Sequence, residues 1–215
     1  MLHPLNGQTP LQLPLTYGAA IGGISPQFNE TIIKLNSKQE AIQREGLNNL
    51  MGLAAKNHPK ALLALADLYY EGRYINKNQK HAFSLTLKAA QTGSAEALNN
   101  LGFMYKSGIG TNKNLSKAFD SFSLAASKGF PPALYNTGLC FESGDGIEKN
   151  IIEAVDYYRK AANEGHILSQ IHLGELYYQN DPTESIFWFR LAEIIQSSNS
   201  LNLIGSSRSG QSSPS

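Results

Sequence analysis

The chain has 215 residues, of which 41% are hydrophobic, so it is long enough to bury a substantial core. Its 18 basic and 17 acidic residues leave a formal net charge of +1 at pH 7, too little to favour the phosphates of a nucleic acid or an anionic membrane as partners. The single cysteine, Cys140, excludes an intramolecular disulfide.

The N-terminal residues 1–27 are rich in Pro, Gly and Leu and show no helical period, so they are predicted to form an irregular arm. Prolines interrupt the apolar stretch that a secretory signal needs, and the first 33 residues contain no Lys or Arg. The most apolar run, residues 17–24, is far shorter than the roughly 18 residues of a membrane-spanning helix. We expect no signal peptide, no membrane span and a cytoplasmic location.

The middle of the chain repeats every 36 residues. The interval holds in the columns Ala61, Ala97, Ala133, Ser169, and Gly93, Gly129, Gly165, and Tyr69, Tyr105, Phe141, Tyr177. Such a period, with two helical patterns in each unit, is typical of a helical solenoid, which usually presents a long surface to a partner and encloses no reaction chamber. We predict full repeats over 61–96, 97–132 and 133–168, with partial repeats over 38–60 and 169–196.

Each unit is predicted to hold two helices. In the second unit, a helix over residues 97–106 ends before Gly108, and the next helix follows Asn114 and ends at Gly129. Asn78, Asn114 and Asn150 recur at the start of the second helix, where they are interpreted as caps rather than ligands. Gly102, Gly138 and Gly174 lie inside the first helix, where each costs about 1 kcal/mol relative to Ala, so we expect close helix packing there.

The array is predicted to span residues 28–196. Residues 38–57 are interpreted as a second helix without its first, and Asp181 and Pro182 are predicted to start a shortened final helix. Residues 197–215 contain nine serines among 19 positions and are predicted to be a disordered tail.

The segment AVDYYRKAANEGHILSQIHLGELYY, residues 154–178, resembles the Sel-one-like repeat, a relative of the tetratricopeptide repeat. The unit before it matches the same pattern at Lys117, Ala118, Phe122, Ala125, Ala126, Gly129, Ala133, Gly138, Phe141, Gly144, Gly146 and Ile147. The resemblance implies an all-α fold of antiparallel helix pairs stacked in a right-handed superhelix. It further implies a non-enzymatic adaptor or regulator that contacts other proteins. The cysteine pairs of secreted family members are absent, so a disulfide-stabilised secreted role is not expected.

If the first helices line the concave face, as the resemblance implies, an unusually apolar stripe faces a partner. Our hypothesis is that Phe103, Tyr135, Leu139 and Ile171 contact a helix or extended segment of a partner protein. The alternative is that these side chains only pack against the adjacent first helix.

The same columns contain polar candidates. Asn99 and Lys106 belong to the stripe itself. Asn100 and Asn136 occupy equivalent places one repeat apart, with His172 at the next, where successive side chains are positioned to hydrogen-bond a peptide main chain. The alternative is that this recurrence has no role.

No set of residues predicts catalysis, a metal or a cofactor. The histidines have no cysteine or acidic partners at metal-ligand spacing, and the loop glycines lack the Lys and Ser or Thr of a phosphate-binding loop. Cys140 and Trp188 are interpreted as packing residues, because they share columns with apolar or aromatic residues. Phe187 shares a column with Asp120 and Asp156, so it either closes the end of the solenoid or meets a partner.

Two other functions remain as alternatives. One is an enzyme with an unrecognised site. The other is a bacterial effector, or a regulator of one, exported to a host cell through the Ser-rich C-terminus.

Overall fold

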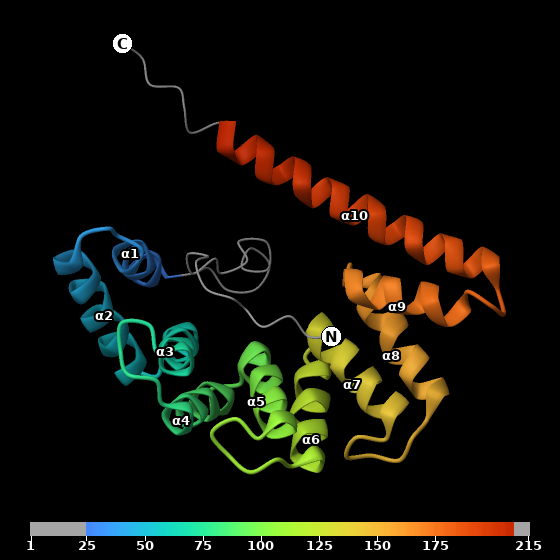
Figure 1. The fold of residues 1–215 in the computed structure, drawn as a ribbon, viewed down its shortest axis with the longest axis horizontal. Helices are drawn as coiled ribbons and strands as arrows, with labels where there is room; N and C mark the ends of the chain where they lie inside the picture. Colours follow the sequence, from blue (N-terminus) through green and yellow to red (C-terminus); the bar gives the residue numbers. More distant parts are fainter. Residues whose placement is uncertain (1–24, 209–215) are drawn as a thin grey trace. The chain divides into compact units, whose positions relative to one another are not determined.

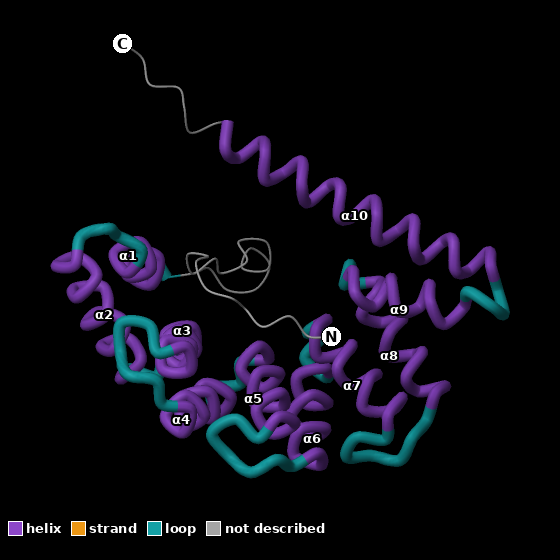
Figure 2. Tube along the Cα trace, in the orientation of Figure 1, coloured by secondary structure: helices purple, strands orange, loops and turns teal. Residues whose placement is uncertain are grey.

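The computed structural model describes residues 25–208, with side chains through residue 198. Every regular element in that range is an α-helix, and short loops join the helices (Figures 1 and 2). The predicted all-α solenoid of helix pairs is confirmed. The chain divides after Gly93 into two compact units.

The first unit contains two helix pairs. They are α1 (Pro26–Leu35) with α2 (Glu40–Ala55), and α3 (Pro59–Glu71) with α4 (Gln79–Gln91). Consecutive helices pack against each other throughout the unit. Phe28 of α1 is fully buried, and its ring stacks on His58 at the start of α3, with ring centroids 5.5 Å apart.

The start of the array differs from the prediction. The irregular arm was expected through residue 27 and only a second helix from residue 38, but α1 begins at Pro26 and completes the first pair. Ser25 caps it, since its Oγ accepts from the backbone N–H of Phe28 at 3.3 Å. The loop between α1 and α2 spans only residues 36–39, compared with 108–114 in the second unit, so the 36-residue interval does not reach α1. Residues 1–24 of the predicted arm lie outside the described part.

The second unit contains three pairs, α5 (Ala95–Ser107) with α6 (Leu115–Ala126), α7 (Pro131–Ser143) with α8 (Ile151–Asn163), and α9 (Ile167–Tyr177) with α10 (Pro182–Arg208). We call α5, α7 and α9 the first helices and α6, α8 and α10 the second helices. Both α7 and α9 pack on the second helix of their own pair and on that of the preceding pair. Each first helix begins two residues before the start that was predicted for its repeat.

The predicted caps are confirmed. The side-chain oxygens of Asn78, Asn114 and Asn150 accept the backbone N–H three residues later, at distances of 2.9 to 3.2 Å. Gly108 and Gly144 end α5 and α7 in the left-handed conformation, with φ of 70° and 79°.

The helical glycines allow an aromatic ring of the second helix to approach the first helix closely. A Cβ at Gly102 would lie 2.7 Å from the Phe122 ring, and one at Gly174 would lie 2.8 Å from the Phe189 ring. Gly138 has the same relationship with Tyr158. The predicted close packing is confirmed, and it explains why glycine recurs inside these helices.

The end of the chain also differs from the prediction. Asp181 and Pro182 do start the last helix, and the Asp181 carboxylate accepts the N–H of Glu184 at 3.0 Å. However, α10 is 27 residues long rather than shortened, and it continues to Arg208 through much of the predicted disordered tail. Extending an existing helix needs no new nucleus, and the first proline after Pro182 is Pro214. Residues 209–215 lie outside the described part.

Candidate functional site

All the predicted partner-binding residues lie on the first helices of the second unit. They are Asn99, Asn100, Phe103 and Lys106 in α5, Tyr135, Asn136 and Leu139 in α7, and Ile171 and His172 in α9. We call this set the first-helix face. Its residues share one unit, so their contacts can be compared directly.

Packing within the unit occupies much of Tyr135 and Leu139. The ring of Tyr135 lies 5.5 Å from that of Tyr158 and 5.2 Å from that of His166, and Leu139 packs beside the same buried cluster. Burial raises the pKa of Tyr135 above its ordinary value. Both side chains therefore make contacts within the unit, and their contact with a partner stays a prediction.

A carboxylate at the end of α7 joins three helices. Glu142 Oε2 accepts from the Tyr158 hydroxyl of α8 at 2.5 Å and lies 2.9 Å from Nε2 of His172 in α9. Sequence reasoning missed this cluster. One signal was available, because Tyr158 occupies the column of Phe122 and a buried hydroxyl there requires an acceptor.

The side chains of Asn100, Asn136 and His172, predicted as a series that binds a peptide main chain, differ in their hydrogen-bond partners in the structure. His172 pairs with Glu142, and Asn136 Nδ2 donates to Asn99 Oδ1 across α7 and α5 at 2.8 Å. The amide of Asn136 retains one N–H and its carbonyl oxygen. The half-buried Asn100 makes no side-chain hydrogen bond to any described residue.

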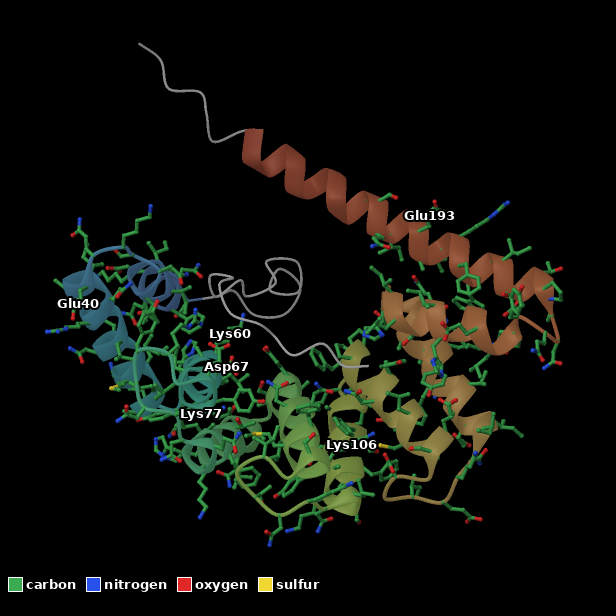
Figure 3. All side chains as sticks on the ribbon, in the orientation of Figure 1. Glu40, Lys60, Asp67, Lys77, Lys106 and Glu193 are labelled. Carbon is green, nitrogen blue, oxygen red and sulfur yellow. The ribbon has the colours of Figure 1, made fainter. Side chains whose placement is uncertain are left out.

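Lys106 and Phe103, both in α5, differ in the contacts that they make within the second unit. Lys106, labelled in Figure 3, forms an ion pair of 2.9 Å with Asp145 in the loop after α7. The hydrogen bond from Lys106 holds the pKa of Asp145 below its ordinary range. By contrast, Phe103 is 43% exposed, a large solvent-accessible fraction for a phenylalanine in the middle of a helix.

The described residues do not bring reactive groups together. Cys140 is fully buried, as predicted, and burial raises the pKa of its thiol to about 11. Within residues 25–208, no group of three His, Cys, Asp or Glu side chains is placed to hold a metal ion. None of the described helices combines the length and apolar character that crossing a bilayer requires.

The fold defines a helical-repeat protein built from stacked antiparallel pairs. The Sel1 repeat model matches residues 59–94, 95–130, 131–166 and 167–193. The chain belongs to the Sel1 repeat family, which confirms the resemblance seen in the sequence. Repeats of this family are in general scaffolds for protein interaction rather than enzymes.

Solved structures support the same fold. A Sel1 repeat protein from Oxalobacter formigenes shares 26% identity and superposes with a TM-score of 0.70, covering 78% of this chain and 69% of the other. A protective antigen of uropathogenic Escherichia coli with an SLR fold has 24% identity and a TM-score of 0.70, covering 78% of this chain. This chain spans only 37% of that antigen's length.

An immunity protein from Pseudomonas aeruginosa, at 19% identity, has a TM-score of 0.56 and covers 80% of this chain and 66% of its own. At that identity the likeness concerns the fold alone. No curated protein matches the chain.

Proposed function

We propose that the first-helix face binds a helix or an extended segment of another protein, with Phe103 as its apolar anchor. The observation that carries this proposal is the 43% exposure of the Phe103 side chain in the middle of α5. Leu139, which occupies the same column one repeat later, instead packs against a buried cluster of the unit. An exposed aromatic side chain on an otherwise packed face has the character of an interaction hot spot.

The polar groups on this face suit a polypeptide. Asn100, one helical turn before Phe103, has both its amide N–H groups and its carbonyl oxygen available to a ligand, and Asn136 retains one donor and one acceptor. Main-chain N–H and C=O groups of a bound segment complement such amides. The net charge of +1 supports neither a nucleic acid nor an anionic surface as the ligand.

Two variants of the full chain test the proposal. Phe103→Asp places a charge on the first-helix face, and Leu124→Asp makes a comparable change on α6, where Leu124 is 52% exposed. We expect the wild type and Leu124→Asp to retain the same partner from an extract of the producing cells, and Phe103→Asp to lose it. Both variants should keep the melting temperature of the wild type, because both positions are exposed.

Binding of the partner to purified Phe103→Asp with the affinity of the wild type would show that the face is not used. A drop in melting temperature for Phe103→Asp alone would show that Phe103 stabilises the unit instead.

A further inference from the structure

The loop between α3 and α4 has an aromatic residue where the later loops have glycine (Figure 2). Tyr74 has a φ of 64°, and Gly110 and Gly146, at the same place in the next two repeats, have φ of 68° and 82°. A left-handed backbone costs free energy at a residue with a side chain and is rare for a bulky one. The surrounding structure must therefore hold Tyr74 in this conformation.

The Tyr74 side chain reaches back to the first helix pair. Its hydroxyl donates to the backbone carbonyl of Leu35 at 3.0 Å. Leu35 is the last residue of α1, so its carbonyl is one of the four at a helix end that have no partner within the helix. The guanidinium of Arg73 lies 5.6 Å from the centre of the Tyr74 ring. These contacts tie the loop after α3 to the end of α1.

The later repeats lack this tie, because Gly110 and Gly146 have no side chain with which to make it. At Gly146 a side chain does not fit, since a Cβ there would clash with the backbone carbonyl of Leu115 at the start of α6. Tyr74, by contrast, has room and remains 42% exposed. The attachment of the first pair therefore differs from that of the pairs that follow the 36-residue interval.

The bond to Leu35 acts on α1 and α2 together, because these two helices are closely joined at the same place. A Cβ added to Gly46 of α2 would lie only 2.7 Å from the backbone nitrogen of Leu35. Beside this contact, Nζ of Lys34 in α1 lies 2.7 Å from Oε1 of Glu45 in α2. The two helices are therefore expected to move as one body.

We infer that Tyr74 is a strained strap that holds the first helix pair on the rest of the first unit, and that this pair opens as one body when the strap is released. Opening exposes Phe28 and Leu35, which are fully buried, so the open state is a minor population. It also parts the Phe28 ring from His58 of α3. Because release lets Tyr74 return to an ordinary backbone conformation, relief of strain offsets part of the lost hydrogen bond and favours opening.

Hydrogen exchange of the full chain, followed by mass spectrometry, tests the inference with two matched variants. Tyr74→Phe removes the hydroxyl that bonds Leu35. Tyr70→Phe is the control, since Tyr70 of α3 is 41% exposed and its hydroxyl makes no hydrogen bond to a described residue.

In the wild type, residues 26–55 should exchange together and faster than the buried part of α3. Tyr74→Phe should speed their exchange by roughly 2- to 10-fold, the effect of one neutral hydrogen bond, and leave α3 unchanged. Tyr70→Phe should exchange as the wild type does. Equal protection of residues 26–55 and α3 in the wild type, or equal behaviour of the two variants, would overturn the inference.

The strain is tested by Tyr74→Gly and Tyr74→Ala, which both lack the hydroxyl. Glycine adopts the observed φ without a steric cost, whereas alanine does not, so residues 26–55 should open less often in Tyr74→Gly than in Tyr74→Ala. More frequent opening in the glycine variant would show that the position is not strained. All of these residues belong to the first unit and none to the first-helix face, so a failure of this inference is distinguishable from a failure of the proposed function.

Discussion

Gly138 of α7 lies beneath the ring of Tyr158 in α8 so closely that a Cβ added to the glycine would be 2.5 Å from the ring atom Cε1. Tyr158 is fully buried and its hydroxyl is held by Glu142, so the ring cannot shift aside. We predict that Gly138→Ala destabilises the protein by about 1–3 kcal/mol through overpacking. This loss outweighs the gain of about 1 kcal/mol in helix propensity. Urea unfolding measures the difference.

The matched control is Gly52→Ala in α2. Apart from its chain neighbours and the backbone of its own helix, no described atom lies within 4 Å of a Cβ added there, so only the helix propensity changes and the variant should gain about 1 kcal/mol. If Gly138→Ala were stabilised to the same extent, the ring of Tyr158 would not restrict this position.

Gln170 is a buried polar residue at a column that holds Leu62, Leu98 and Leu134 in the earlier repeats. Its Nε2 donates to the carbonyl of Ala162 at 2.9 Å, but its Oε1 has no partner among the described residues. We predict that Gln170→Leu stabilises the protein by about 1 kcal/mol, because it removes a buried acceptor without a hydrogen bond. In this variant the Ala162 carbonyl still accepts a hydrogen bond from the backbone N–H of Gly165, which lies at 3.0 Å. A lower unfolding midpoint for the variant would mean that the bond to Ala162 matters more than the unpaired oxygen.

The thiol of Cys140 should be inert in the native protein. With a pKa of about 11 and a fully buried side chain, only about one thiol in a thousand is ionised at pH 8. We expect a thiol-specific chromogenic disulfide to react with one group per chain in denaturant and to react with the native protein only as fast as the unit opens. Equal rates with native and denatured protein would contradict the burial of Cys140.

His166 should make stability depend on pH. Burial lowers its pKa below the ordinary 6.5, so the unfolded chain binds a proton at pH values where the folded chain does not. Its stabilising effect is therefore complete above pH 6.5 and declines as the pH falls below that value. His166→Phe, which copies Phe130 of the preceding repeat, should unfold with a weaker pH dependence between pH 7 and 5. The other histidines are present in both proteins, so identical pH profiles would show that His166 does not contribute.

The sequence was most informative where the same local requirement recurs. The caps at Asn114 and Asn150 and the glycines at 102, 138 and 174 each satisfy a need of a single helix or helix pair, so an interval of 36 residues was enough to find them. The same interval missed α1, because the loop after it is shorter than the loops that follow.

Contacts between different repeats were harder to predict. Glu142 and His172 are 30 residues apart, and the register places each on its helix without showing toward which neighbour the side chain turns. For this reason the proposed use of His172 beside Asn136 did not anticipate its pairing with Glu142. The exposure of Phe103 likewise depends on how far neighbouring side chains cover α5, which only the three-dimensional arrangement shows.

The most direct test of the proposed interaction face is site-specific photocrosslinking. A benzophenone amino acid is introduced at position 103 of the full chain, and in a control protein at position 124, where the exposure of the natural side chain is similar. We predict that irradiation in the producing cells links position 103 to one protein, identified by mass spectrometry, and that position 124 does not form this product. Crosslinking of that protein from position 124 but not from position 103 would contradict the assignment of the first-helix face.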